Sequence, residues 1–314
     1  MLTHRRQSLA KKTPTTTAPL WGWYVAALAA HTGWGVYPVL GRYLQTVSEL
    51  PSMSVLVLGG LPLTFWLCCV VLPRHGWRIY AAPVLWVFGA VTVLRSITNI
   101  VSQRYTLAIY VQLIGLLTPF LVVLLNRVVL KERAPRFTLP ALSLITLGAM
   151  LMMSEIDATG VTLTLTEADW LGITLALASS LFLALYMILV RRTAHTAVSA
   201  NAVLAFQTVL IQISALALSL LWHEDWGQWR AINAQDWAVF AAYSLLVVVI
   251  ANGLQIAAIR RLGAPMVSSL MGWRLVATLS LGMLLLGERL TSPWQGAGML
   301  LVLGTITWYL SRQQ

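Results

Sequence analysis

Long apolar segments alternate with short polar connections along most of the chain. Crossing the roughly 30 Å hydrocarbon core of a bilayer takes about 20 helical residues. Ten segments approach or exceed this length, and each predicts a transmembrane helix. These segments are residues 20–40, 53–72, 81–103, 107–130, 137–154, 168–190, 199–222, 236–258, 265–286 and 293–311. The pattern therefore predicts an all-α integral membrane protein with ten transmembrane helices.

The composition agrees with a membrane protein and argues against a soluble one. Hydrophobic residues make up 58% of the 314 residues and charged residues only 10%, whereas a soluble domain carries about a quarter charged residues. A net charge of +11 could indicate nucleic-acid binding, but the basic residues lie between the apolar segments and form no continuous face. We therefore expect membrane lipid, and no nucleic acid, as the surroundings of this protein.

The basic residues also predict the orientation. Residues 1–19 are polar and basic, and with this tail inside, the inner segments hold fifteen Lys and Arg residues and the outer loops four. This excess predicts a multi-pass protein of the inner membrane with both termini in the cytoplasm. We do not expect a cleaved signal peptide, because the apolar stretch that follows the tail is long and lacks a convincing cleavage site.

The two halves of the chain share short motifs. Residues 130–133 (LKER) close the fourth predicted helix and residues 286–289 (LGER) close the ninth, and Gly148 and Gly304 follow at the same offset. Because each half has an odd number of helices, the copies must insert as inverted repeats, which surround a central site in many secondary transporters. The expected organisation is a cytoplasmic tail (1–19), a first five-helix repeat (20–154), a periplasmic linker (155–167) and a second five-helix repeat (168–311).

These residues resemble the drug/metabolite transporter superfamily, specifically its EamA-type members. The resemblance covers residues 20–311 and depends on residues 118–120 (TPF), the LKER motif and Gly148, although the second repeat has residues 274–275 (RL) in place of TP. It implies that the third, fourth, eighth and ninth helices enclose a central cavity. The first, second, sixth and seventh helices would gate it, and the fifth and tenth would be peripheral. It also implies export or exchange of small metabolites such as amino acids.

Two arginines lie deep inside predicted helices. Arg95 belongs to the third helix and Arg274 to the ninth, and no Asp or Glu lies within a predicted helix away from its ends. A buried arginine at a helix centre costs at least roughly 2.5–3.5 kcal/mol on insertion scales. Because a guanidinium matches the geometry of a carboxylate, both are candidates for binding an anionic substrate, with Arg274 first. Alternatively, backbone carbonyls near Pro119 or polar side chains satisfy these groups.

Further polar residues recur at helical spacing. Arg95, Asn99 and Gln103 share one face of the third helix, and Asn252 and Gln255 share a face of the eighth. Such faces should point to the protein interior and not to lipid. They would either line the cavity or form hydrogen bonds between helices.

The first helix adds aromatic and titratable candidates. His31, Trp34 and Tyr37 follow one another at the i, i+3 spacing, and Trp273 lies in the ninth helix. His31 could carry a proton at neutral pH, or it could be a hydrogen-bonded interior residue, which we expect. The aromatic rings could form the wall of a pocket or simply pack. Pro119 should kink the fourth helix, because proline lacks a backbone N–H.

Catalytic and cofactor motifs are missing from the sequence. The P-loop, HExxH and GxSxG motifs are absent, so we expect no ATP hydrolysis, no enzymatic activity and no cofactor. The adjacent Cys68 and Cys69 offer too few ligands for a metal and point in different directions, so a disulfide is not expected either.

We therefore expect a secondary transporter that works by alternating access on a small-molecule substrate. It would export or exchange amino acids or related organic anions or zwitterions across the inner membrane, as a monomer or weak dimer. Efflux of cationic or aromatic drugs and a passive channel remain alternatives.

Overall fold

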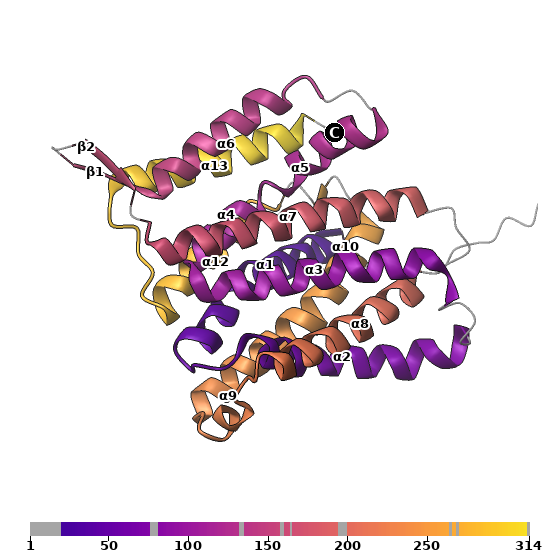
Figure 1. Ribbon diagram of the computed structural model, residues 1–314. Coiled ribbons are helices and arrows are strands. Elements are labelled where there is room, and N and C mark those ends of the chain that lie inside the picture. Colours follow the sequence, from indigo (N-terminus) through magenta and orange to yellow (C-terminus); the bar gives the residue numbers. More distant parts are fainter. Residues whose placement is uncertain are drawn as a thin grey trace, which may run out of the picture.

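The computed structural model of the protein describes residues 20–75, 81–131, 135–157, 160–163, 165–193, 200–263, 266–267 and 270–312. Apart from one small hairpin, the regular elements in these residues are helices that run roughly side by side (Figure 1). The helices are α1 (Leu20–Thr46), α2 (Ser52–His75), α3 (Pro83–Tyr105), α4 (Ala108–Gly115), α5 (Thr118–Leu125), η2 (Asn126–Leu130), α6 (Thr138–Met152), α7 (Glu167–Thr193), α8 (Ala200–Leu221), η3 (Trp226–Arg230), α9 (Ala234–Ala241), η4 (Ala242–Ala251), α10 (Asn252–Leu262), α12 (Trp273–Leu285) and α13 (Pro293–Ser311).

The all-helical part of the predicted fold class is confirmed, with candidate membrane spans among the helices. Within the described residues, six helical stretches are long and apolar enough to cross a membrane. They are Ser52–Val70, Pro83–Tyr105, Ala108–Val128, Glu167–Leu189, Ala202–Leu221 and Ala234–Ile259. The other predicted segments contain α1, α6, α12 and α13, of which α6 and α12 are apolar but shorter.

Helix boundaries differ from the predicted ones where the chain has a special backbone residue. The first helix continues through Pro38 to Thr46. The fourth segment is interrupted between Gly115 and Thr118, and Pro119 occupies the first turn of α5, where its missing N–H is tolerated. The ninth segment becomes α12 only at Trp273, later than predicted, after residues 270–272 form turns.

The predicted linker between the halves contains an antiparallel hairpin that the sequence analysis did not anticipate. Strand β1 (Ser154–Asp157) pairs with β2 (Gly160–Leu163), with Ser154 opposite Leu163 and Asp157 opposite Gly160. Helical periodicity gave no reason to look for strands in so short a segment. The hairpin projects from one end of the helices (Figure 1).

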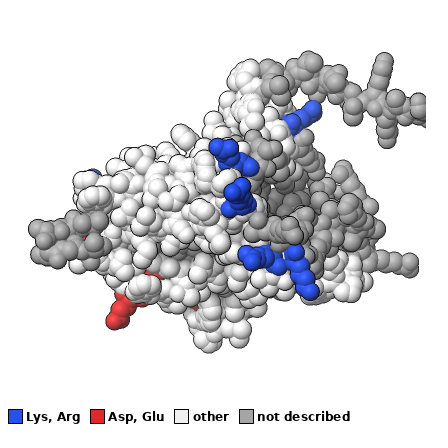
Figure 2. Space-filling view, turned by 90° about the horizontal axis from the view of Figure 1, so that it is seen from above, with Lys and Arg blue, Asp and Glu red and all other residues white. Residues whose placement is uncertain are grey.

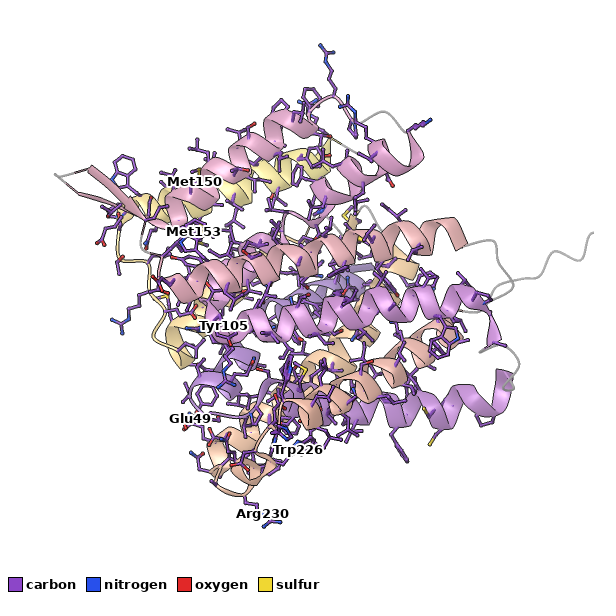
Figure 3. All side chains as sticks on the ribbon, in the orientation of Figure 1. Glu49, Tyr105, Met150, Met153, Trp226 and Arg230 are labelled. Atoms are coloured by element: carbon purple, nitrogen blue, oxygen red, sulfur yellow. The ribbon has the colours of Figure 1, made fainter. Side chains whose placement is uncertain are left out.

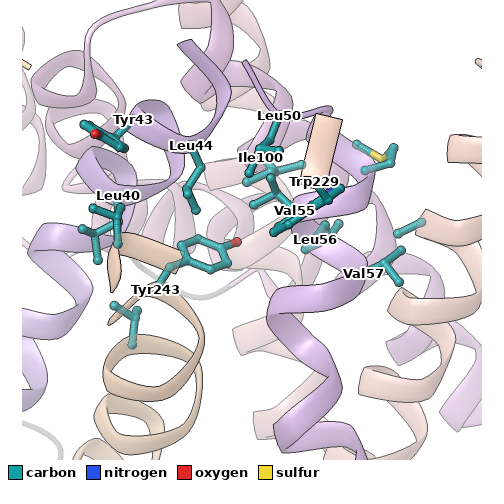
Figure 4. Packing of buried hydrophobic residues seen from close by; sticks show 14 residues of the cluster. Leu40, Tyr43, Leu44, Leu50, Val55, Leu56, Val57, Ile100, Trp229 and Tyr243 are labelled. Carbon is teal, nitrogen blue, oxygen red and sulfur yellow. The ribbon is translucent and has the colours of Figure 1, made fainter. Parts of the chain in front are cut away.

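Two apolar cores hold the helices together. The larger one joins α1, α2 and η4 through residues such as Leu44, Met53 and Tyr243 (Figure 4). The second joins α4, α5, α6, α12 and α13, where Phe120 stacks on Tyr309 with ring centroids 4.6 Å apart. Helices α6 and α13 pack against each other at the edge of the molecule (Figure 1). The expectation that the fifth and tenth helices are peripheral agrees with this arrangement.

The described connections that were predicted to be extracytoplasmic meet at one end of the helices. Figure 3 places Glu49, Tyr105, Met153, Trp226 and Arg230 toward this end, which also carries the hairpin. Most of the Lys and Arg side chains visible in Figure 2 lie away from it, and the visible Asp and Glu side chains lie near it. On the face shown in Figure 2, most of the visible charges of opposite sign are thus separated along the helix direction.

An ion pair joins four elements at this end. Arg42 Nε of α1 lies 3.2 Å from Glu288 Oε1, and the Arg42 guanidinium also donates to the backbone carbonyls of Gln103 and Thr106. Glu288 accepts hydrogen bonds from the N–H groups of Ala108 (3.0 Å) and Ile109 (3.4 Å). These N–H groups belong to the first turn of α4 and have no partner within the helix. Burial raises the pKa of the Glu288 carboxyl, while the Ala108 N–H and the Arg42 charge oppose this shift.

Replacing Glu288 with glutamine should therefore destabilise the protein. The amide keeps an acceptor for Ala108 but leaves Arg42 without its ion partner. Because the Arg42 side chain is 20% exposed, we expect a loss of roughly 1–3 kcal/mol, below the value for fully buried pairs. Thermal unfolding in detergent measures this loss. Arg289→Gln, at an exposed neighbouring position, is the control, and equal melting temperatures for the two variants would contradict the assignment.

Candidate functional site

A cavity of about 150 Å³ lies between α1, α2, α3, α8, η4 and α10. Its wall combines aromatic, amide, hydroxyl and apolar side chains with one arginine. The lining residues are Trp34, Tyr37, Leu56, Gly60, Leu63, Thr64, Thr92, Arg95, Ser96, Asn99, Leu204, Gln207, Thr208, Ile211, Gln212, Tyr243, Val248 and Asn252. An interior that mixes apolar surface with a few polar groups is typical of a site for a small molecule.

Three aromatic rings form a continuous wall. Tyr37 and Tyr243 stack with ring centroids 5.3 Å apart, and Trp34 lies 5.9 Å from Tyr37 in a tilted arrangement. The Tyr243 hydroxyl donates to the Tyr37 hydroxyl at 3.4 Å. Gly59 of α2 faces the Tyr243 ring, which a Cβ atom at this position would approach to 2.5 Å. The close approach of α2 and η4 therefore needs a glycine here.

Arg95 supplies the positive charge of the wall. It lies in the middle of α3, and its backbone carbonyl accepts a hydrogen bond from Ser179 of α7 (3.1 Å). The lining residues include no Asp or Glu. Among the side chains that the structure describes, Arg42 and Glu288 form the ion pair that lies within 4 Å. No described carboxylate therefore lies close enough to neutralise Arg95.

Some residues of the two predicted polar faces, on α3 and on α10, line the cavity. Asn99 and Asn252 line the cavity, whereas Gln103 and Gln255 are not among its lining residues. Gln103 is fully buried and donates to Asn99 Oδ1 at 2.8 Å, so it orients the Asn99 amide. Asn252 Nδ2 donates to the carbonyl of Val248, one turn earlier.

Arg274 lies outside this wall, in a contact between α12 and α1. Its Nε donates to His31 Nδ1 at 2.9 Å, and its guanidinium lies 5.8 Å from the centre of the Trp34 ring. His31 Nε2 lies 2.8 Å from the carbonyl of Val267, which can only accept, so the proton must be on Nε2. His31 is thus neutral and both of its ring nitrogens have partners.

Trp273 belongs to the same contact. Its Nε1 donates to the Thr32 hydroxyl at 2.9 Å, and Trp273 is not among the residues that line the cavity. Nearby, the Thr278 hydroxyl donates to the carbonyl of Gly35 at 2.6 Å. Gly35 packs on the backbone of Arg274, where a Cβ atom would lie 2.5 Å from the Arg274 carbonyl oxygen. The two helices therefore approach closely on the face that carries His31.

Several lining residues were missed by the sequence analysis. Thr64 of α2 and Gln207 and Gln212 of α8 line the cavity. Polar side chains within otherwise apolar helices were the signal that could have found them. The helices around the cavity also differ from the expected set. Alongside α3, η4 and α10, the wall uses α1, α2 and α8, and no residue of α4, α5 or α12. Proline and turn residues divide the fourth and ninth segments, and their helices pack into the second core instead.

The segment that carries Tyr243 has an unusual backbone. Residues Ala242–Ala251 form the π-helix η4, between the α-helices α9 and α10. Long π-helical runs are rare, and π-bulges occur frequently at functional sites. Here the wider turns precede Asn252 and carry Tyr243 and Val248, all three of which line the cavity.

Comparison with known proteins gives a family match for the second half of the chain. The EamA-like transporter family matches residues 170–310. A solved structure, described as "Crystal structure of protein", is similar over 94% of this chain and 100% of its own, with 16% sequence identity and a TM-score of 0.59. No curated protein matches the chain. At this identity the solved structure supports the fold alone.

The described residues therefore contain a set of candidate membrane-spanning helices, and residues 170–310 match a family whose members are transporters and not enzymes. The match relates this second half of the chain to the drug/metabolite transporter superfamily.

His31 offers a test of the α1–α12 contact. Replacing it with glutamine should lower the melting temperature, because the geometry of both ring hydrogen bonds is lost. The response of transport to an imposed pH gradient should stay unchanged, because His31 is held neutral by Arg274 and Val267. Uptake into vesicles with and without a pH gradient measures this. If the variant lost its gradient response while counterflow persisted, His31 would be a proton carrier.

Proposed function

We propose that the protein exports or exchanges small organic anions or zwitterions, such as amino acids and related metabolites, across the inner membrane by alternating access. The observation that carries this proposal is Arg95, a positive charge in the cavity wall with no acidic residue among its lining neighbours. Placing an arginine at membrane depth costs free energy. An anionic substrate group would compensate for that cost.

A second donor supports an anion-binding region. Trp34 Nε1 is buried and has no hydrogen-bond partner, and an indole N–H can only donate. Trp34 belongs to the same wall as Arg95, and Arg274 lies against its ring. We assign the substrate contact to Arg95 and Trp34, while Arg274 positions Trp34. This reverses the order of the two arginines that the sequence suggested. Trp273 and Gln103 take supporting roles through their hydrogen bonds, and Gln255 is not among the lining residues.

The same wall argues against a cationic substrate. A carrier of cations is expected to have a carboxylate at membrane depth, and the residues that line the cavity include none. The aromatic wall of Trp34, Tyr37 and Tyr243 is compatible with an apolar part of the substrate next to its anionic group. A passive channel is distinguished by counterflow, because preloaded substrate accelerates uptake through a carrier and not through a pore.

The packing of the helices supports ten transmembrane segments in two inverted repeats. If each segment is replaced by its counterpart five positions later, the most extensive helix contacts exchange among themselves, although smaller ones such as α1 with α3 have no comparable counterpart within the described residues. The contact of α3 with α7 corresponds to that of α1 with η4 and α10, and the contact of α1 with α12 to that of α7 with α4 and α5. The pairs α2 with α8 and α6 with α13 each correspond to themselves. Such a pseudo-two-fold relation is what two inverted copies would produce.

Orientation can be tested by cysteine labelling. In a background that lacks Cys68 and Cys69, a cysteine at Gly227 should react with an impermeant thiol reagent added to intact cells. A cysteine at Pro135 should react only after the cells are opened, because the basic connections are expected to face the cytoplasm. Both residues lie outside the long apolar stretches. The reverse pattern would overturn the proposed orientation.

Substitution of Arg95 tests the anion site. Arg95→Gln should weaken binding of carboxylates by roughly tenfold or more, as expected for the loss of a charge-assisted hydrogen bond. Binding of neutral amide analogues should change much less. Arg95→Lys keeps the charge but loses the planar fork and should be intermediate. Binding to purified protein can be followed by thermal stabilisation.

The control for Arg95 is Arg104→Gln, an exposed position in the last turn of the same helix. It should leave binding unchanged. The comparison between charged and neutral ligands separates a site defect from a folding defect, which weakens all ligands alike. Equal losses for both kinds of ligand in Arg95→Gln would refute the anion site.

A further inference from the structure

The cavity wall contains two polar atoms that lack partners on the side of α2 and α8. Thr64 Oγ1 and Gln212 Oε1 are both buried, and neither forms a hydrogen bond. Their residues line the same cavity as Arg95. A buried polar atom without a partner destabilises the protein, because its hydrogen bonds to water are lost and not replaced. Native structures keep few such atoms, and a bound ligand is one way to satisfy them.

The Gln212 amide has a defined orientation. Its Nε2 points toward the backbone carbonyl of Leu56 at 3.5 Å, and a carbonyl oxygen can only accept. The nitrogen therefore faces α2, and Oε1 is the atom left over. Gly60, one turn after Leu56, leaves room for the amide, since a Cβ atom there would lie 2.0 Å from Gln212 Nε2. Thr64 follows one turn later on the same face of α2.

Two other amides of the wall, those of Gln207 and Asn99, have partners for their oxygen atoms. Thr92 lies within hydrogen-bond distance of Gln207 Oε1 (3.5 Å), and Asn99 Oδ1 accepts from Gln103. Gln212 thus presents an acceptor, and Thr64 a hydroxyl, that the protein itself leaves unused. An unused acceptor is the complement of a donor carried by a ligand.

We propose that Gln212, together with Thr64, is a specificity-determining subsite that accepts a hydrogen bond from an N–H or O–H group of the substrate. This inference rests on the proposed function, in which the carboxylate of the substrate binds at Arg95. It narrows the substrate class from organic anions in general to carboxylates that also carry a hydrogen-bond donor. Simple carboxylates without a donor would leave Gln212 Oε1 unsatisfied and bind less tightly.

The experiment compares matched ligands on the purified full-length protein. One series is valine, 2-hydroxyisovalerate and isovalerate, and a second is phenylalanine, phenyllactate and phenylpropionate. Within each series the carbon skeleton and the carboxylate are constant, and only the donor changes. Affinities are obtained from thermal stabilisation over a range of concentrations. In the series that fits the cavity, we expect a donor-bearing ligand to bind roughly tenfold more tightly than the plain acid.

Two variants assign this preference to Gln212. Gln212→Leu should reduce the ratio between donor-bearing and donor-free ligands to about one. Gln228→Leu is the matched control, because Gln228 Oε1 in η3 is also buried without a partner but does not line the cavity. It should keep the wild-type ratio. Because each ratio is measured within one variant, a general loss of stability cannot imitate the result.

The outcomes separate this inference from the proposed function. If the wild type bound no carboxylate of either series, the proposed function would fail. If it bound all members of a series equally, or if Gln212→Leu kept the preference, the anion site would stand and the donor subsite would be wrong. If the preference is found and depends on Gln212, the comparison of amino with hydroxy acids shows whether the donor is an ammonium or a hydroxyl group.

Discussion

Inside a membrane every backbone N–H and C=O must find a partner within the protein, and the remaining features of this fold follow from that constraint. Where a helix is interrupted, local bonds replace the missing ones. Between α4 and α5, the N–H groups of Leu116 and Leu117 donate to carbonyls three or four residues earlier, and the Thr118 hydroxyl donates to Gly115. At the start of α4, the Glu288 carboxylate accepts from two free N–H groups. Irregular backbone is thus confined to places where other groups can satisfy it.

The same constraint decides how charge is placed. Arg42 is paired with Glu288 and two carbonyls, and Arg274 donates to a neutral histidine and lies against an indole ring. Arg95 is the arginine of the cavity wall, and no carboxylate within the described part of the chain pairs with it. Three arginines of one chain therefore have three environments. An arginine that has enough partners holds helices together, and one that lacks them is available to a ligand.

Helix α1 connects these environments. It packs against α3, α4, η4, α10 and α12. Along its length it places His31 at the contact with α12, Trp34 and Tyr37 in the cavity wall, and Arg42 at the end with the ion pair. A shift of α1 relative to its neighbours would therefore act on the cavity and on the ion pair together. Such coupling through one packed helix is compatible with a transporter that changes conformation around a fixed site.

The sequence by itself determined the class of protein and the position of most helices, because an apolar run of about 20 residues has few alternatives to a membrane helix. It also pointed to five residues that line the cavity, since polar and aromatic residues in an apolar helix need an interior location. They are Arg95, Asn99, Trp34, Tyr37 and Asn252. Only the tertiary structure decided which of two deep arginines faces the cavity, because partners such as His31 and Val267 lie far away in the sequence. Likewise, the position of Gln212 opposite Leu56 and Gly60 depends on how α2 and α8 pack, and helical periodicity carries no information about which helix comes next to which.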